Sequence, residues 1–143
     1  MNSNGKKAMA ARLAPLPLKK HATELSQIDR TRLVMLYESG KYQELENQAT
    51  MLAGRHPESG FLWKALGFAL LAQNKDAVSA LKKATSLMPA DPQTHNDLGV
   101  ALLDSRRPDA AKKSFLDALA LNPNYAEAHN NLGNALLVLN QLA

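Results

Sequence analysis

The chain repeats one pattern of residues about every 34 positions, and no other feature of the sequence restricts its fold as strongly. Leu98 and Leu132 are 34 residues apart, and so are Pro89 and Pro123. The aligned rows are Trp63, Leu66, Gly67, Leu70, Ala77, Leu81, Ala84 and Pro89; His95, Leu98, Gly99, Leu102, Ala111, Phe115, Ala118 and Pro123; and His129, Leu132, Gly133 and Leu136. A single unit of this size cannot bury its apolar face alone, so we expect neighbouring units to stack into one continuous core.

The columns of these rows predict paired helices. Gly67, Gly99 and Gly133 share a column inside helical patterns, where glycine costs about 1 kcal/mol relative to alanine. We expect close approach of the paired helix, which a Cβ atom would block, to offset that cost. Apolar residues recur three and four positions apart, and a proline ends each second helix. The sequence therefore predicts an all-α fold. The expected helices span 28–39, 43–55, 61–73, 76–88, 92–105, 109–121 and 126–140.

The rows resemble the tetratricopeptide repeat, whose pattern is W-x2-L-G-x2-Y, then A-x3-F, then P. The resemblance covers about residues 26–143 and implies a right-handed superhelical array with an inner groove. The expected repeats are 26–59, 60–91, 92–125 and a truncated 126–143. The row at 60–91 is two residues short, and we expect the loss to fall between its helices. In the first row Arg32 and Leu33 stand where leucine and glycine are usual, as the polar outer face of a terminal repeat allows.

The positive charge of the chain lies in its first 25 residues. This segment has five basic residues against Glu24 alone, whereas the remainder has 12 basic and 12 acidic residues. The basic residues are Lys6, Lys7, Arg12, Lys19 and Lys20. We interpret residues 1–25 as a disordered basic leader; a loose contact with an anionic surface and a transit-like segment are the alternatives. Because residues 26–143 are neutral, no nucleic-acid partner is expected.

The sequence gives no sign of catalytic chemistry. It has no cysteine, no glycine-rich phosphate loop and no H-E-x-x-H pattern, so we expect no enzyme activity, cofactor or metal in this chain. His95 and His129 share the column of Trp63 and are interpreted as bulky packing residues at helix starts. One repeat should separate them too far for a shared metal ion. The lack of cysteine fits a reducing compartment or a periplasmic chain that simply lacks this residue, and of these we expect the cytoplasm. No apolar run is long enough for a membrane span, so no membrane partner is expected.

In the family that the rows resemble, the first helix of each pair lines the inner groove, where a peptide or partner protein binds. The resemblance implies the following groove candidates: Arg30, Val34, Tyr37, Phe61, Lys64, Phe68, Leu71, Gln93, Asn96, Asp97, Val100, Leu103, Glu127, Asn130, Asn131, Asn134 and Leu137. Phe61 and Phe68 stand out because the repeat does not require large aromatics there, and exposed apolar groups anchor partners. The alternative is that neighbouring helices or the basic leader cover them.

Two precedents in related families match only in part. Some chaperone-binding members hold a terminal carboxylate with lysine and asparagine, and Lys64 and Asn96 match two such positions. The other cationic column of that clamp contains Ala72 and Asp104, which do not fit. O-linked N-acetylglucosaminyltransferases carry a ladder of asparagines along the groove. The corresponding column here is Thr31, Ala65, Asp97 and Asn131.

The amino-acid sequences of several segments resemble those of the N-terminal repeats of large bacterial proteins of the O-linked N-acetylglucosaminyltransferase type. The segments are Gly40-Lys41-Tyr42, His56-Pro57, residues 60–64 (GFLWK) and residues 126–135 (AEAHNNLGNA). Two functions follow as hypotheses: a scaffold that binds a partner in its groove, or the non-catalytic, substrate-presenting arm of a larger glycosyltransferase-like enzyme. We also expect the apolar face of the truncated last helix to pack on a second copy or to fray.

Overall fold

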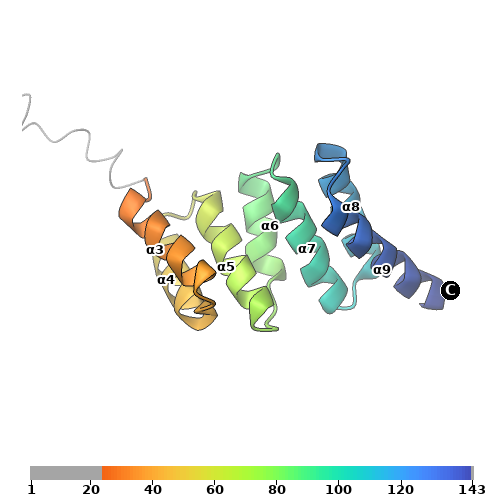
Figure 1. Cartoon of the computed structure of the whole chain (residues 1–143), viewed down its shortest axis with the longest axis horizontal. Coiled ribbons are helices and arrows are strands. Elements are labelled where there is room, and N and C mark those ends of the chain that lie inside the picture. Colours follow the sequence, from red (N-terminus) through yellow and green to blue (C-terminus); the bar gives the residue numbers. More distant parts are fainter. Residues whose placement is uncertain (1–23, 143) are drawn as a thin grey trace, which may run out of the picture.

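The computed structural model describes residues 24–142, and these residues form seven helices and no strand (Figure 1). The all-α prediction is confirmed, and every helix boundary lies within two residues of its expected position. The helices are α3 (Gln27–Glu38), α4 (Tyr42–Arg55), α5 (Gly60–Ala72), α6 (Val78–Leu87), α7 (Pro92–Asp104), α8 (Pro108–Leu121) and α9 (Ala126–Leu142). Of the expected leader, only Glu24 and Leu25 are described, and Leu25 is buried in the core beside α3.

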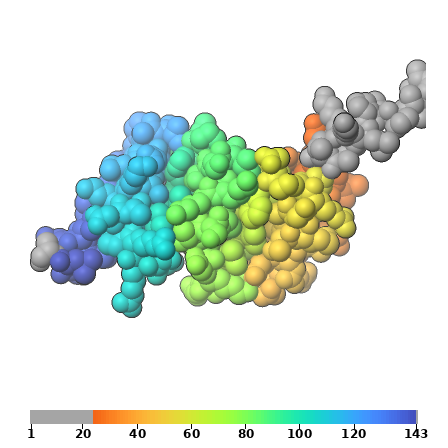
Figure 2. Space-filling model, turned by 180° about the vertical axis from the view of Figure 1, so that it is seen from behind, coloured from red at the N-terminus to blue at the C-terminus, as the bar shows by residue number. Residues whose placement is uncertain are grey.

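The helices form hairpins that stack in one elongated row. Figure 1 shows α3, α5, α7 and α9 along one face, with their second helices behind them. The opposite face is made mostly by α4, α6 and α8, seen as yellow, green and cyan in Figure 2. Each helix packs on its neighbours in the chain, and α5 also contacts α7, as α7 contacts α9. The first helices therefore form a continuous surface across the repeats.

The glycine column lets each hairpin close tightly. A Cβ atom added at Gly67 would overlap the side chain of Leu81, and one added at Gly99 would overlap the ring of Phe115. Phe115 and Leu81 are fully buried at these contacts. A Cβ atom at Gly133 would meet nothing within 4 Å. The expected close approach is therefore confirmed in the two complete repeats that carry the glycine.

The turn inside each hairpin has the same backbone form. Gly40, Asn74 and Arg106 have φ values of 69°, 56° and 61°, in the left-handed region that glycine adopts most easily. In each case the next residue donates its amide to a carbonyl in the last turn of the first helix, as Lys75 does to Leu70 at 2.9 Å. Because these turns match, the two missing residues fall after Lys75. They shorten the start of α6, which has 10 residues where α4 and α8 have 14.

Aromatic and histidine side chains join consecutive hairpins. Trp63 Nε1 donates to the Pro57 carbonyl at 2.8 Å, His95 Nε2 to the Pro89 carbonyl at 2.8 Å, and His129 Nε2 to the Pro123 carbonyl at 2.7 Å. The column therefore fastens the start of each first helix to the end of the preceding repeat. This confirms a structural role for His95 and His129.

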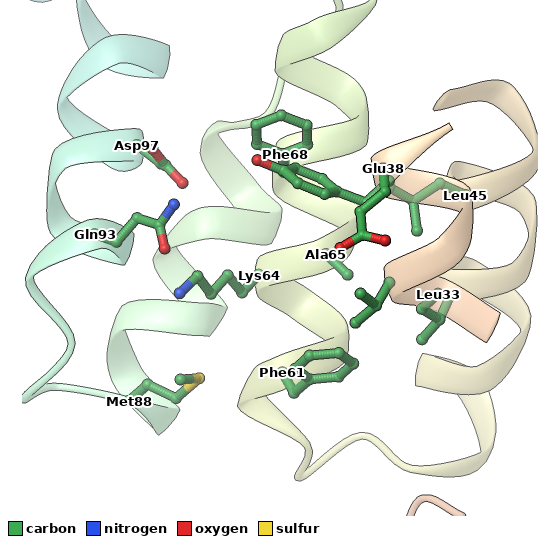
Figure 3. A pocket seen from close by; sticks show the side chains of 12 residues that line it. Leu33, Glu38, Leu45, Phe61, Lys64, Ala65, Phe68, Met88, Gln93 and Asp97 are labelled. Atoms are coloured by element: carbon green, nitrogen blue, oxygen red, sulfur yellow. The ribbon is translucent and has the colours of Figure 1, made fainter. Parts of the chain in front are cut away.

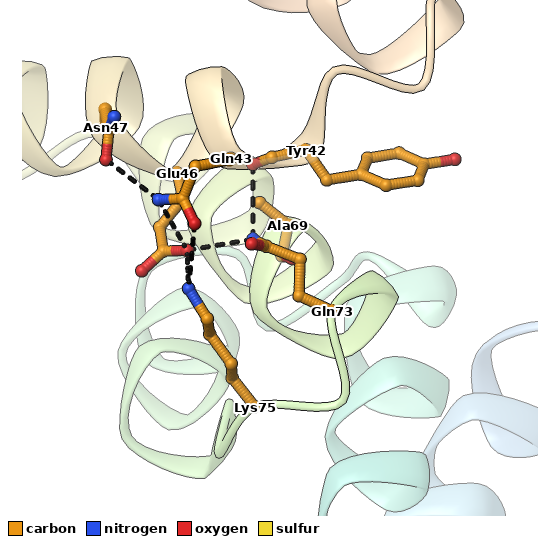
Figure 4. Close-up of polar contacts among 7 residues, drawn as sticks. All are labelled: Tyr42, Gln43, Glu46, Asn47, Ala69, Gln73 and Lys75. Atoms are coloured by element: carbon orange, nitrogen blue, oxygen red, sulfur yellow. Dashed lines mark hydrogen bonds and ion pairs between the residues drawn. The ribbon is translucent and has the colours of Figure 1, made fainter.

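A second connection joins α4 to the turn after α5 (Figure 4). Glu46 accepts hydrogen bonds from Lys75 at 2.6 Å and from Gln73 at 2.8 Å. Gln73 also donates to the Tyr42 carbonyl at 3.3 Å. The hydrogen bond from Lys75 holds the pKa of Glu46 below its usual value, against the opposing effect of desolvation. The network fixes the first hairpin relative to the second.

Candidate binding groove

A cavity of about 320 Å³ opens on the face made by the first helices (Figure 3). Its walls come from α3, α5 and the start of α7, with contributions from α4 and from the end of the second repeat. The lining residues are Leu33, Val34, Tyr37, Glu38, Leu45, Phe61, Lys64, Ala65, Phe68, Met88, Gln93 and Asp97. Three consecutive repeats therefore contribute to one concave site.

Aromatic rings form the apolar side of this cavity. The ring centroids of Tyr37 and Phe68 are 4.5 Å apart at a tilt of 60°, and Tyr42 meets Phe68 edge-on at 5.9 Å. The Arg30 guanidinium lies 4.9 Å from the centre of the Phe61 ring. Phe61 and Phe68 are half-buried against the core, so neighbouring helices do cover part of each ring. Val34 and Tyr37 remain 42% and 45% exposed and provide the accessible apolar surface.

The polar side of the cavity begins with an ion pair between two repeats. Lys64 Nζ lies 2.7 Å from Asp91 Oδ2. Asp91 also caps α7, accepting from the Gln93 amide at 3.2 Å and from Thr94 Oγ1 at 2.6 Å. Desolvation opposes the ionisation of Asp91, but the hydrogen bonds from Lys64 and Thr94 outweigh it and hold its pKa below the usual value. The ammonium group of Lys64 is therefore already neutralised inside the protein.

Asp97 lies on α7 six residues after Asp91 and has a different environment. Its side chain points toward the cavity beside Gln93 (Figure 3), and the residue is only 9% exposed. The Oδ2 atom is buried and has no hydrogen-bond partner among residues 24–142. Desolvation, together with repulsion from Glu127, raises the pKa of Asp97 to about 7, although Lys64 acts in the opposite direction. The wall of the groove thus contains a carboxyl group that forms no ion pair with the described residues, since Lys64 is paired with Asp91.

The asparagines that the sequence assigned to the groove divide into two groups. Asn96 is fully buried; its Nδ2 donates to Glu127 at 3.2 Å and its Oδ1 accepts from Asn131 at 3.0 Å. Asn96 and Asn131 therefore connect α7 to α9. Asn130 and Asn134 are exposed on α9 and do not line the cavity.

Seven of the predicted groove residues meet in this cavity: Val34, Tyr37, Phe61, Lys64, Phe68, Gln93 and Asp97. Val100 is half-buried against the core between α7 and its neighbours and does not line it. Sequence reasoning missed Asp91, although Asp91-Pro92 followed by Thr94 is a helix-start signal that could have marked a fixed carboxylate. No pattern in the sequence pointed to Glu38 or Met88.

The described helices contain none that is long and apolar enough to cross a membrane. Within residues 24–142 no group of three or more histidine, cysteine or acidic side chains is placed to hold a metal ion.

Comparisons with known proteins agree with this architecture. A family model described as "Tetratricopeptide repeat" matches residues 96–143. The first TPR of Spaghetti (RPAP3), bound to the HSP90 peptide SRMEEVD, has a TM-score of 0.74 at 24% identity and is matched over 78% of this chain and 90% of that one. The second TPR domain of human RPAP3, in complex with the HSP70 peptide SGPTIEEVD, gives 0.71 at 20% identity over 75% and 91%.

A bacterial protein has the same arrangement. The type III secretion chaperone SycD of Yersinia enterocolitica, in complex with a peptide of the translocator YopD, gives a TM-score of 0.69 at 17% identity over 78% of this chain and 92% of that one. Identities this low describe the fold and not the ligand. The 34-residue period, the glycine-closed hairpins and these solved structures show that the chain has the fold of a tetratricopeptide repeat array, and the family model matches its residues 96–143.

Proposed function

We propose that the chain binds an extended peptide segment of a partner protein in the groove formed by α3, α5 and α7. The observation that carries the proposal is the cavity of about 320 Å³, because its apolar side remains open to solvent at Val34 and Tyr37. Ligand sites in proteins are typically concave, mostly apolar and supplied with a few directed polar groups, and their volumes begin near 300 Å³. This volume fits one large apolar anchor residue.

The chemistry of the lining supports a peptide ligand. Aromatic side chains dominate binding energy in interfaces, and the Tyr37–Phe68 pair presents a rigid apolar surface. Polar groups from α5 and α7 lie beside that surface, so a peptide crossing the repeats would meet the apolar wall and the polar wall in succession. The peptide complexes of RPAP3 and SycD add support, because each is a peptide-bound member of the same fold.

The proposal is tested by removing the exposed apolar wall without disturbing the core. The double variant Val34→Ser, Tyr37→Ser should lose binding to short peptides selected from a random library by the wild-type chain. The matched control is Met51→Ser, Leu116→Ser, which removes apolar side chains of similar exposure, 47% and 46%, from the opposite helices. We expect roughly a tenfold or larger loss of affinity in the first variant and none in the second. Equal affinities in both variants would place the ligand elsewhere.

The second candidate function is the substrate-presenting arm of a larger bacterial glycosyltransferase-like enzyme. The exposed amides of Asn130 and Asn134 on α9 favour it, because amide groups can hold the backbone of an extended substrate. The same groove would then deliver a protein substrate to a separate active site. Reading the gene beyond codon 143 distinguishes this arm from a binding scaffold in the cytoplasm.

Self-association through α9 is part of the same proposal. Leu136, Leu137 and Leu142 are 45%, 62% and 73% exposed on this helix. SycD, which shares the fold, is described in one structure as an alternative dimer. A sedimentation measurement should show concentration-dependent dimers that Leu137→Gln weakens; a monomer at all concentrations would exclude the pairing.

A further inference from the structure

The groove contains one acidic group whose hydrogen bonding is incomplete. Asp97 Oδ2 is buried and has no hydrogen-bond partner in the described part of the chain, although the side chain faces the cavity (Figure 3). Buried polar atoms in folded proteins nearly always have a hydrogen-bond partner, and an ionised carboxylate accepts only. A group that donates from within the cavity would complete this site.

The cations close to the cavity are already occupied. Lys64 pairs with Asp91 at 2.7 Å, and Arg30 lies over the Phe61 ring at 4.9 Å. The carboxylate of Glu38 lines the opposite wall on α3, and Glu127 adds negative charge from α9. The surroundings of the cavity therefore have an excess of negative charge, and of these carboxylates Asp97 is the buried one. A ligand cation would be attracted to this wall, and a ligand carboxylate would be repelled.

We propose that Asp97 determines the specificity of the groove by pairing with an arginine or lysine of the partner peptide that lies next to its apolar anchor. This inference rests on the proposed peptide-binding function and identifies the class of ligand. The guanidinium or ammonium group donates to Oδ2, while the anchor residue packs on Tyr37 and Phe68. The preference is opposite to that expected of a groove whose free lysines hold a terminal carboxylate.

The pairing links binding to pH. Asp97 is influenced by Glu127 and the Tyr125 hydroxyl from α9 and its preceding turn, by Lys64 on α5, and by Asp91 on its own helix; Glu38 lies across the cavity. In the free protein the pKa of Asp97 is about 7. A bound cation lowers this value, so the Asp97 carboxyl releases a proton to solvent as the peptide binds near neutral pH. Affinity should therefore rise about tenfold between pH 6 and pH 8.

The test uses the full chain and three sets of capped, fluorescent nonapeptides with one fixed leucine. The residues next to the leucine are arginine in the first set, glutamine in the second and glutamate in the third. Affinities are measured by fluorescence polarisation at pH 6 and pH 8. The variants are Asp97→Asn, which keeps the shape of the side chain, and Asp117→Asn, which removes one carboxylate from the exposed surface of α8 as the control.

We expect the arginine set to bind at least tenfold more tightly than the glutamate set at pH 8. Asp97→Asn should remove this preference and the pH dependence, while Asp117→Asn retains both. Binding that favours glutamate, or a preference that persists in Asp97→Asn, overturns the inference. Affinity that falls as pH rises also overturns it, because a protonated Asp97 would then be donating to the ligand.

Two further results separate the possible occupants of the groove. If no set binds, or if Val34→Ser, Tyr37→Ser leaves binding intact, the proposed function itself fails. If that variant abolishes wild-type binding but the peptide sets bind the wild type equally, only the specificity assigned to Asp97 is wrong.

A full chain in which the leader cations are replaced by glutamine tests whether the leader competes with the peptide. If it binds arginine peptides tenfold more tightly than wild type, residues 1–23 occupy the groove, and the partner assignment is wrong.

Discussion

Lys64 Nζ donates to Asp91 Oδ2 at 2.7 Å, and this pair connects α5 to the first turn of α7. The sequence matched Lys64 to a position that holds a terminal carboxylate in some chaperone-binding repeat proteins. Here the carboxylate is internal and is fixed by Thr94 and by the start of its own helix. The pair therefore positions the polar wall of the groove, and the cationic clamp is not available to a ligand.

Replacing Lys64 with methionine tests this assignment. The pair is partly exposed, so we expect the free energy of unfolding to fall by only about 1 kcal/mol, measured by urea denaturation. The affinity for arginine-bearing peptides should not decrease, since the variant removes a cation from an acidic wall. A tenfold or greater loss of peptide affinity in a folded Lys64→Met variant would show that Lys64 contacts the ligand.

Asp97 should destabilise the free protein above neutral pH. Its folded pKa of about 7 lies above the ordinary value of 3.8, so the native state binds a proton more tightly than the unfolded state does. The free energy of unfolding therefore decreases as pH rises from about 4 to about 7 and then levels off. Asp97→Asn should be more stable than wild type at pH 8, by an amount on the order of 2 kcal/mol, with the difference vanishing near pH 4. Thermal melts at both pH values measure this; a variant less stable than wild type at pH 8 would contradict it.

The substitutions Gly99→Ala and Gly133→Ala should change the free energy of unfolding in opposite directions. At Gly99 the added Cβ overlaps Phe115, so we expect a loss of about 1–3 kcal/mol in unfolding free energy. At Gly133 the Cβ meets no atom within 4 Å, so the higher helix propensity of alanine should stabilise α9 by about 0.5–1 kcal/mol. Chemical denaturation of the two variants gives both values. Equal effects of the two substitutions would mean that the hairpin has room for a Cβ atom between Gly99 and Phe115.

The contribution of His95 to stability should depend on its hydrogen bond to the Pro89 carbonyl. His95→Phe keeps a ring but cannot donate to the Pro89 carbonyl, and we expect a cost of about 1 kcal/mol. His95→Trp should retain most of the stability, because Trp63 makes the equivalent contact to Pro57 one repeat earlier. If phenylalanine and tryptophan are equally tolerated in urea denaturation, packing alone accounts for the column.

The sequence predicted those features that recur with the repeat. Local pattern and period predicted the seven helices, the close helix contacts at Gly67 and Gly99, and the structural role of His95. Seven groove candidates also converge in one cavity, because the first helix of each repeat presents the same face.

Other features depend on how neighbouring repeats are oriented, which the period does not specify. Asn96 has the spacing of a groove residue, yet the contact between α7 and α9 buries it against Glu127 and Asn131. The pairing of Lys64 with Asp91 joins residues 27 positions apart and could not be read from either helix alone. The unpartnered oxygen of Asp97 arises only once these contacts have used the surrounding donors.

Locating a bound peptide on the folded chain shows whether α3, α5 and α7 form the binding groove. In an NMR titration of the isotopically labelled full chain with an arginine-bearing peptide, we expect the largest amide shifts near Tyr37, Phe68 and Asp97, on α3, α5 and α7. The amides of α4, α6 and α8 that face the opposite surface should change little. Shifts concentrated on that opposite surface, with Tyr37, Phe68 and Asp97 unaffected, would contradict the claim that this groove is the binding site.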